Sequence, residues 1–221
     1  MEFERERKKL VNNLVSFGVL RTKRIIEAFL KIPRHLFVTK DQLPYAYVDV
    51  ALPTLKNSTI SQPSTVAIMT EALQPKEGDK ILEVGTGSGW QAAILSYCVG
   101  ENGRVITIEI DKDLVEFARK NLKKVGIKNV KVIHGDGGLG YEKEAPYDGC
   151  IITAACPRIP PPIIKQTKVN GRIVAPIGTA WEQRVILAVK EKYGKLKKID
   201  LGAFVFVPMR GSYGFSGAGR I

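Results

Sequence analysis

The chain has 221 residues, 44% of them hydrophobic, and carries a formal net charge of +12. This length fits one large α/β domain with a sizeable core and argues against two full domains. No apolar run approaches the roughly 20 residues that span a membrane, and the charged first residues do not have the pattern of a signal peptide. We therefore expect a soluble, cytoplasmic protein with no membrane partner.

The basic charge permits a nucleic-acid partner, because positive surfaces raise the affinity for phosphate backbones. The Lys and Arg clusters at residues 5–9 and 190–198, however, also contain acidic or apolar residues. This mixture is typical of a solvated helix face and a hairpin turn. We therefore expect no nucleic-acid partner.

The cysteines and histidines do not form a metal or disulfide pattern. Cys98, Cys150 and Cys156 are an odd number at spacings that fit neither a disulfide framework nor a zinc site, and the chain has only two histidines. We expect three buried or partly buried thiols and no bound metal.

Two helices and a long loop are predicted before the first long strand. Helical apolar stripes over residues 10–15 and 25–30 end at Gly18 and Pro33. Residues 41–57 have no clear period and predict a long irregular connection, which is usually functional at this length. A helix opened by the next Pro-Ser pair then runs through residue 73.

The most informative stretch is a strand that runs into a glycine turn and a helix. Residues 80–84 predict a buried strand, and Ser88 with Gln91 predicts a capping box before a helical body at residues 92–95. Three glycines follow the strand at alternate positions: Gly85, Gly87 and Gly89. A strand, a glycine turn and a helix N-terminus together predict a nucleotide pocket, although the ligand need not be a phosphate.

The next strand, at residues 104–110, places Glu109 at its end, where an acidic residue suits a ribose diol. Dinucleotide folds usually have the spacing G-x-G-x-x-G, whereas here G-x-G-x-G follows a strand that carries Glu83. This difference disfavours a nicotinamide dehydrogenase.

The remaining elements continue an alternating pattern. We expect a helix from 111 to 126, strands at 130–134, 147–153 and 171–176, a short helix at 160–168, and a hairpin of 185–189 with 203–207 around Tyr193 and Gly194. This order predicts an α/β fold with a doubly wound, mostly parallel seven-stranded sheet of Rossmann-like topology, an antiparallel hairpin at its C-terminal edge and an N-terminal helical addition. Within one domain, residues 1–75 form helices and a substrate loop, 76–178 a cofactor core, 179–210 the hairpin and 211–221 a flexible tail.

Ligands in such sheets bind at the carboxyl ends of the strands. This rule brings the glycine loop, Glu109, Asp136 and residues 153–155 to one crevice. Asp136 is expected to accept a hydrogen bond from an adenine amino group. The alternative is a plain Gly-Asp-Gly surface turn.

Several segments resemble the signatures of one family. They are Ile-Pro-Arg-His-Leu-Phe (32–37), Ala-Tyr-Val-Asp-Val-Ala-Leu-Pro (46–53), Thr-Ile-Ser-Gln-Pro (59–63), Leu-Glu-Val-Gly-Thr-Gly-Ser-Gly-Trp-Gln-Ala-Ala (82–93), Gly-Asp-Gly (135–137), Gly-Arg-Ile-Val-Ala-Pro-Ile-Gly (171–178) and Phe-Val-Pro-Met (206–209). Together they resemble the protein-L-isoaspartate O-methyltransferases. The glycine loop is shared by many S-adenosylmethionine-dependent methyltransferases, whereas the first and third segments are more selective.

The resemblance implies a repair enzyme that methylates the free carboxylate of isoaspartyl residues in proteins and peptides. We expect it to be a monomer. S-adenosyl-L-methionine is then the cofactor and S-adenosyl-L-homocysteine the product. The implied cofactor residues are Glu83, Gly85, Thr86, Gly87, Ser88, Gly89, Glu109, Ile110, Asp136 and Gly137. The implied catalytic residues are Ser61 and Thr59, and the implied substrate-binding residues are Ile60, Arg210 and Tyr213.

Two departures and three rival functions accompany this interpretation. Some relatives have a His after Ser-x-Pro where this chain has Ser64, Thr65 and Val66, and Trp90 stands where Tyr is frequent. An RNA or DNA methyltransferase that modifies amino groups would usually carry Asp/Asn-Pro-Pro-aromatic, which residues 153–157 lack. A small-molecule methyltransferase stays an alternative, whereas a non-enzymatic module would not need the three strand-end motifs.

Overall fold

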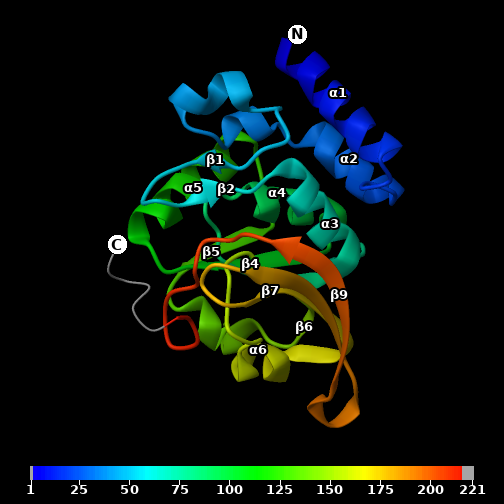
Figure 1. Cartoon of the computed structure of the whole chain (residues 1–221), viewed down its shortest axis with the longest axis vertical. Helices are drawn as coiled ribbons and strands as arrows, with labels where there is room; N and C mark the ends of the chain where they lie inside the picture. Colours follow the sequence, from blue (N-terminus) through cyan, green and yellow to red (C-terminus); the bar gives the residue numbers. More distant parts are fainter. Residues whose placement is uncertain (1, 216–221) are drawn as a thin grey trace.

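A computed structural model describes residues 2–215 of the chain (Figure 1). Its centre is a seven-stranded sheet in the order β5-β4-β3-β6-β7-β8-β9. The strands are β3 (Lys80–Val84), β4 (Arg104–Glu109), β5 (Val130–His134), β6 (Tyr147–Ile152), β7 (Thr167–Gly178), β8 (Gln183–Lys190) and β9 (Leu196–Phe204). The first five are parallel, and β8 and β9 are antiparallel additions at one edge. The predicted fold class is therefore confirmed.

Helices cover both faces of the sheet because alternate residues of its buried strands point to opposite sides. Ile81 packs in a core with Met69 of α3 (Pro63–Leu73) and Leu95 of α4 (Trp90–Val99). The adjacent Leu82 packs in a second core with Ile163 of α6 (Pro161–Gln166). The helix α5 (Lys112–Lys124) lies against β5 and β4. Both faces are thereby removed from water, as a parallel sheet requires.

The N-terminal addition consists of α1 (Glu2–Ser16) and α2 (Lys23–Lys31), as predicted (Figure 1). Helix α2 packs on α4, and α1 packs on α2. The following loop contains two 3-10 turns and a short antiparallel ribbon, β1 (Leu52–Pro53) with β2 (Thr59–Ile60). The prediction of a wholly irregular loop missed this ribbon, because two-residue strands leave no periodicity in the sequence.

The capping box predicted at Ser88 is not formed. Helix α4 begins one residue later, with Gly89 at the N-cap in a left-handed conformation (φ 88°) and no side-chain cap. The Gln91 amide instead donates to the Thr70 hydroxyl of α3 at 3.1 Å. Burial of this end of the helix therefore directs Gln91 to a tertiary partner.

Two strand boundaries near the C-terminal edge were predicted incorrectly. The last strand is residues 196–204 instead of 203–207. It follows the turn at 192–194 with Leu196 paired to Lys190, and after a register shift between Ile186 and Arg184 it ends with Phe204 paired to Gln183. The apolar residues after Phe204 leave β9 and form a parallel bridge between Pro208 and Ala155. The prediction followed hydrophobicity, whereas an exposed edge strand can be polar.

The strand β7 is also longer than predicted. It begins at Thr167 and not at residue 171, so the preceding helix α6 ends at Gln166 instead of residue 168. The Thr167 hydroxyl donates to the Ile163 carbonyl, while its backbone pairs with Tyr147 of β6. Sheet pairing therefore takes over directly from the last helical turn.

The three cysteines are buried and free, as predicted. Across residues 2–215, every helix is too short or too polar to cross a lipid bilayer. Part of the predicted tail, residues 216–221, lies outside the described residues.

Candidate active site

A cleft of about 980 Å³ lies at the carboxyl ends of β3, β4 and β6. One lip is the segment from the β1–β2 ribbon to the start of α3, and the other is residues 203–210. Among the predicted site residues, the cleft is lined by Thr59, Ile60, Ser61, Gly85, Thr86, Gly87, Ser88, Glu109, Ile110, Gly137 and Arg210. The strand-end rule thus brings most of the candidates together. Glu83, Gly89, Asp136 and Tyr213 do not line it.

The glycine loop is shaped by contacts that a larger residue would break. Gly85 has a left-handed conformation (φ 94°). A Cβ atom there would lie 2.5 Å from the Thr153 hydroxyl oxygen, which is 2.6 Å from the Gly85 carbonyl oxygen. Gly85 thus fits both the backbone and the space beside β6, and Thr153 fixes the start of the loop.

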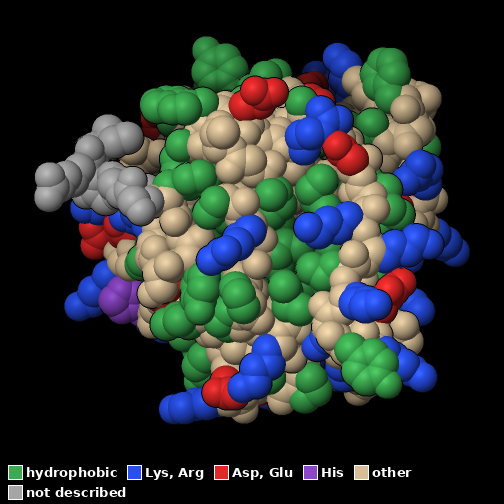
Figure 2. Space-filling model, turned by 60° about the horizontal axis from the view of Figure 1, so that its bottom comes forward, with side chains coloured by type: hydrophobic (Ala, Val, Ile, Leu, Met, Phe, Trp, Pro, Cys, Tyr) green, Lys and Arg blue, Asp and Glu red, His purple; other side chains and the backbone are tan. Residues whose placement is uncertain are grey.

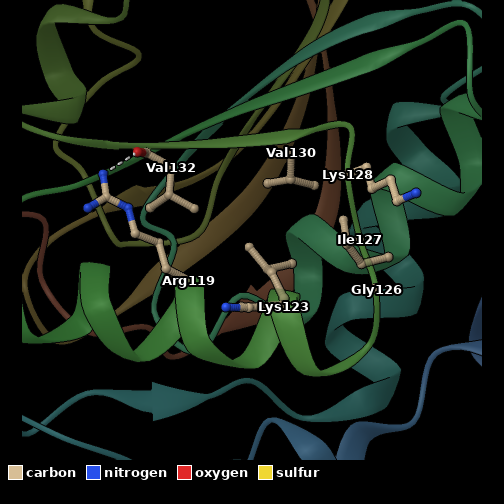
Figure 3. Close-up of a pocket in the computed structure, with 8 residues that line it drawn as sticks. Arg119, Lys123, Gly126, Ile127, Lys128, Val130 and Val132 are labelled. Carbon is tan, nitrogen blue, oxygen red and sulfur yellow. Dashed lines mark hydrogen bonds between the residues drawn. The ribbon is translucent and has the colours of Figure 1, made fainter.

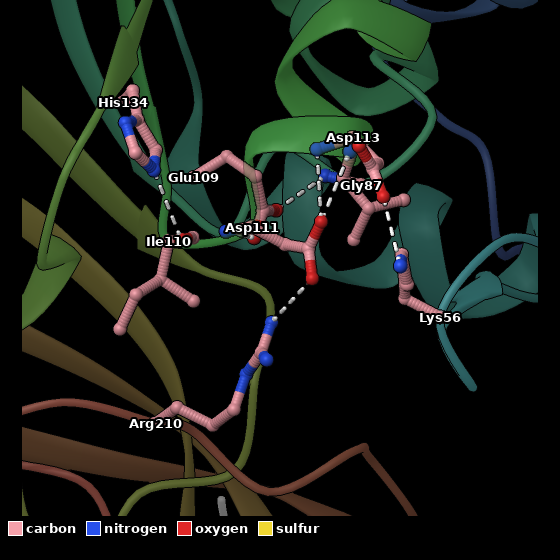
Figure 4. Close-up of polar contacts among 9 residues, drawn as sticks. Lys56, Gly87, Glu109, Ile110, Asp111, Asp113, His134 and Arg210 are labelled. Atoms are coloured by element: carbon pink, nitrogen blue, oxygen red, sulfur yellow. Dashed lines mark hydrogen bonds and ion pairs between the residues drawn. The ribbon is translucent and has the colours of Figure 1, made fainter.

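Glu109 connects the glycine loop to the end of β4 (Figure 4). One carboxylate oxygen accepts the Gly87 N–H at 3.0 Å and the other accepts the Asp111 N–H at 3.0 Å. The side chain is 6% exposed and lines the cleft. Because each carboxylate oxygen has about two lone-pair sites, Glu109 keeps acceptor capacity for a ligand diol.

Glu83 is a buried carboxyl group behind the loop. The residue is fully buried, and neither of its carboxyl oxygens has a hydrogen-bond partner among the described residues. The neighbouring Thr107 hydroxyl is engaged with Thr86 at 2.7 Å. Burial raises the pKa of Glu83 to about 8, the nearby Thr107 hydroxyl opposes this rise, and the Glu109 carboxylate adds to it. A cationic ligand group nearby would lower this pKa again.

Asp136 lies in the turn after β5 and holds the C-terminal segment. Its carboxylate accepts the Gly138 N–H at 2.9 Å and the Ser212 N–H at 2.7 Å. Tyr213 packs beside Gly138, where an added Cβ would lie 3.1 Å from the Tyr213 Cβ. Only Gly137 of this turn reaches the cleft wall. The adenine contact predicted for Asp136 stays a prediction.

We call the lip that runs from the β1–β2 ribbon to the start of α3 the acceptor lip. It carries two hydroxyl side chains on either side of a buried apolar residue. Thr59 is exposed, Ser61 is half-buried, and Ile60 between them is buried. The Thr59 carbonyl oxygen lies 4.0 Å from the position of a Cβ built on Gly87, so this lip faces the glycine loop.

Two ion pairs join these lips to the N-terminal end of α5 (Figure 4). Lys56 of the acceptor lip pairs with Asp113 at 2.8 Å, and Arg210 of the opposite lip approaches Asp111 at 3.7 Å. Asp111 also caps α5 by accepting the Asp113 and Leu114 N–H groups, as predicted. Both cations at the rim are thus paired with carboxylates.

A second depression, of about 420 Å³, lies between α5 and β5 (Figure 3). It is lined by Arg119, Leu122, Lys123, Gly126, Ile127, Lys128, Val130 and Val132. Arg119 donates to the Val132 carbonyl at 2.9 Å. None of the predicted site residues lines this depression, so the larger cleft is the candidate site.

The charges around the cleft distinguish between cofactor classes. The Glu109 carboxylate at the glycine loop would repel a pyrophosphate and attract a cation, and a cation near the buried Glu83 would favour the ionised form of that carboxyl group. A sulfonium nucleoside with an ammonium group fits this arrangement, because Glu109 suits its ribose and Glu83 has no hydrogen-bond partner within residues 2–215. Sequence reasoning missed Lys56 and the lining by residues 204–208. The apolar run at 203–207 was a usable signal, but it was assigned to a strand.

The strand order and this cleft define the class of Rossmann-like methyltransferases. A model of the protein-L-isoaspartate (D-aspartate) O-methyltransferase family matches residues 5–213. The chain belongs to this family.

Individual relatives of known sequence or structure support this family assignment. The chain is 46% identical to a protein-L-isoaspartate O-methyltransferase of Methanopyrus kandleri, with 96% of this chain and 95% of the relative covered. It is 47% identical to protein-L-isoaspartate O-methyltransferase 2 of Archaeoglobus fulgidus, with 97% of each covered. A solved protein-L-isoaspartate O-methyltransferase has a TM-score of 0.85 and 34% identity. That match covers 94% of this chain and 66% of the solved one, so the chain spans about two thirds of its length.

Proposed function

We propose that this protein transfers the methyl group of S-adenosyl-L-methionine to the free carboxylate of L-isoaspartyl residues in proteins and peptides. The ester starts the return of the damaged residue to aspartate, and S-adenosyl-L-homocysteine is the second product. The observation that carries the proposal is the pairing of an acidic cofactor crevice with an acceptor lip of hydroxyl groups, in a chain of this family.

The cofactor supplies an electrophilic methyl group bound to a positively charged sulfur. In our proposal Glu109 holds the ribose hydroxyls, and the N–H groups of the glycine loop and the end of β4 hold the rest of the nucleoside. The cofactor residues are Glu83, Gly85, Thr86, Gly87, Ser88, Gly89, Glu109, Ile110, Asp136 and Gly137. Glu83 favours the cationic end of the ligand, because burial leaves this carboxyl group without another partner.

The acceptor lip aligns the substrate carboxylate. A carboxylate is already ionised near neutral pH and needs no general base, so alignment is the main requirement. Ser61 and Thr59 orient it by donating hydrogen bonds. Ile60 and the apolar part of residues 203–209 withhold water, which disfavours the separated charges more than the transition state. Arg210 and Tyr213, from the opposite lip and the segment behind it, bind the peptide.

We further infer that the protein acts as a cytoplasmic monomer without nucleic acid. On the face in Figure 2, Lys and Arg side chains are scattered among apolar and acidic ones and do not form a continuous basic patch. Several are paired, such as Lys168 with Asp148 and Arg184 with Asp200. A pairing of this kind weakens the attraction for a phosphate backbone.

The test is methyl transfer from labelled S-adenosylmethionine to three acceptors. We expect base-labile label on an isoaspartyl peptide, and little or none on the same peptide with L-aspartate or on deproteinised RNA. A site whose polar groups match the displaced main chain leaves them unsatisfied with a normal peptide. Equal labelling of the two peptides, or base-stable label on RNA, would contradict the proposal.

The role of the acceptor lip is tested separately with Ser61→Ala. We expect lower turnover with a smaller change in cofactor affinity, because alignment is lost where the reacting atoms meet. Loss of cofactor binding with unchanged turnover of the saturated enzyme would reverse the assignment.

A further inference from the structure

Arg34 occupies the space under the acceptor lip and is fully buried. Its side chain donates three hydrogen bonds to main-chain carbonyl groups of this region. The acceptors are the oxygens of Ala46 at 2.7 Å, Val50 at 3.0 Å and Ser61 at 3.1 Å. These carbonyls lie on both sides of the β1–β2 ribbon, so one guanidinium group fixes both ends of the loop that carries Thr59 and Ser61.

The guanidinium group also contacts the ring of Trp90. Its central carbon lies 5.2 Å from the ring centroid of Trp90. Trp90 is the first residue of α4, follows the glycine loop directly and lines the cleft. Phe29 of α2 holds the indole edge-on at a centroid distance of 5.5 Å. Arg34 thus contacts the acceptor lip and the start of the cofactor helix at once.

The charge of Arg34 is held by dipoles and an aromatic face. Among residues 2–215 it forms no ion pair within 4 Å. Burial lowers the pKa of Arg34 to about 10, and Asp49 opposes this change, so the group stays cationic at neutral pH. Asp49 itself accepts the Ser64 N–H at 2.8 Å at the start of α3.

A buried cation is expensive to desolvate, and a hydrophobic residue would often be as stabilising. Three planar, directed N–H bonds to one loop are what an arginine adds and a lysine cannot reproduce. This favours a role in loop geometry over a role in core stability alone.

We propose that Arg34 is a positioning residue for methyl transfer. By bonding to the Ser61 carbonyl and contacting Trp90, Arg34 holds the main chain of Ser61 at a fixed place relative to the glycine loop. The inference rests on the proposed function, because it concerns the acceptor side of that same cleft. A small displacement of aligned groups can lower a rate by up to about 100-fold. Removal of the Arg34 side chain should therefore lower turnover more than it weakens cofactor binding.

The experiment compares Arg34→Lys and Arg34→Ala with matched changes at Arg24. Arg24 also donates to main-chain carbonyls, those of Cys98 and Tyr97, and pairs with Glu77. These partners lie at the far end of α4 and its surroundings, away from the cleft. Thermal unfolding with S-adenosylhomocysteine present establishes that each variant is folded, and Arg34→Lys keeps the test available if Arg34→Ala does not fold.

We expect Arg34→Lys to lower kcat between ~10-fold and ~100-fold while the Kd for S-adenosylhomocysteine changes by less than ~3-fold. Arg24→Lys should leave both close to wild type. Millimolar guanidinium should restore part of the kcat of Arg34→Ala, whereas methylammonium should not, because only guanidinium can reproduce the planar donor set.

The fluorescence of Trp90 reports on its contact with Arg34, and a change in stability alone would not alter it. The chain has two tryptophans, and Trp181 is 84% exposed at the β7–β8 turn. In a Trp181→Phe background, Arg34→Lys should shift the Trp90 emission and raise its quenching by acrylamide, and the Arg24 variants should not.

Unchanged kcat in folded Arg34→Lys, or equal losses in kcat and cofactor affinity, would overturn the role of Arg34. So would losses that the Arg24 variants share, or guanidinium rescue no better than methylammonium. A wild-type enzyme inactive on the isoaspartyl peptide contradicts the proposed function itself. An active wild type with an unimpaired Arg34→Lys variant contradicts only the positioning role.

Discussion

The two sides of the cleft are built by different means. The proposed cofactor side consists of turns at the ends of consecutive parallel strands, and local sequence places Gly85 and Glu109 there. The acceptor side has only a ribbon of two-residue strands and the segment 203–210, which runs from the end of the last strand, and it depends on bonds between side chains and distant main chain. The cofactor side of the cleft therefore follows from the sheet, whereas the geometry of the acceptor side depends on a few buried polar side chains that bond to distant main chain.

The two sides also differ in the partners of their buried charged groups, Glu109 on the cofactor side and Arg34 on the acceptor side. Glu109 bonds to N–H groups 2 and 22 positions away in the chain, both in turns next to strands. Arg34 reaches carbonyls 12, 16 and 27 positions away. The separations overlap, so the difference lies in the backbone: Glu109 bonds to turns that directly follow strands of the main sheet, whereas Arg34 bonds to a loop outside that sheet. We therefore expect local changes in the glycine loop to disrupt the cofactor side, and loss of the Arg34 side chain to disrupt the acceptor side.

The largest effect is expected from Gly85→Ala on the cofactor side. The new Cβ meets the Thr153 hydroxyl and the backbone is left-handed, so the loop must move. We expect at least ~100-fold weaker binding of S-adenosylhomocysteine by calorimetry, about 2.7 kcal/mol. The control is Gly126→Ala, which has a positive φ but no atom within 4 Å of the added Cβ and should keep cofactor affinity. Equal losses in both would show that backbone strain alone matters.

Glu109→Ala should weaken cofactor binding by roughly 1 to 3 kcal/mol, the range for hydrogen bonds to a charged group. The Gly87 and Asp111 N–H groups also lose their acceptor. Calorimetry on a folded variant measures the loss. Unchanged affinity would mean that Glu109 does not hold the ribose.

Glu83→Gln should change how the stability of the ligand-free protein depends on pH. Between the ordinary value of 4.5 and about 8, the folded state keeps a proton that the unfolded state has lost. The free energy of unfolding of wild type therefore falls as pH rises through this window and levels off above it. The glutamine side chain does not titrate in this range. The free energy of unfolding of the variant relative to wild type should therefore increase by about 2 kcal/mol between pH 6 and 8. Denaturant unfolding at several pH values measures it, and parallel pH profiles would refute the buried, partnerless carboxyl group.

The smallest effect is expected from Lys56→Ala at the rim. The Lys56–Asp113 pair is exposed, and such pairs contribute little and are screened by salt. We expect less than a ~2-fold change in the Kd for S-adenosylhomocysteine, which decreases further at high salt. A larger, salt-independent change would show that this pair, and not only buried anchors, sets the acceptor side.

The sequence by itself determined the elements whose signals are local. Buried strands, a left-handed glycine turn, the Asp111 cap and the N-terminal helices follow from backbone sterics and apolar periodicity, which a short window contains. The strand-end rule then gathered the glycine loop, Glu109 and residues 153–154 in one cleft, whereas Asp136, which the rule also placed there, does not line it.

Only the tertiary structure decided the contacts and boundaries that depend on distant partners. The last strand took its register from β8 and not from its own hydrophobicity, and Gln91 bonded to Thr70 instead of capping its helix. Arg34 shows the same dependence, since its acceptors and Trp90 come together only when the loop folds onto α4. Hydrogen bonds between residues far apart in the chain leave no periodic trace in its sequence, because their geometry exists only after the chain has folded.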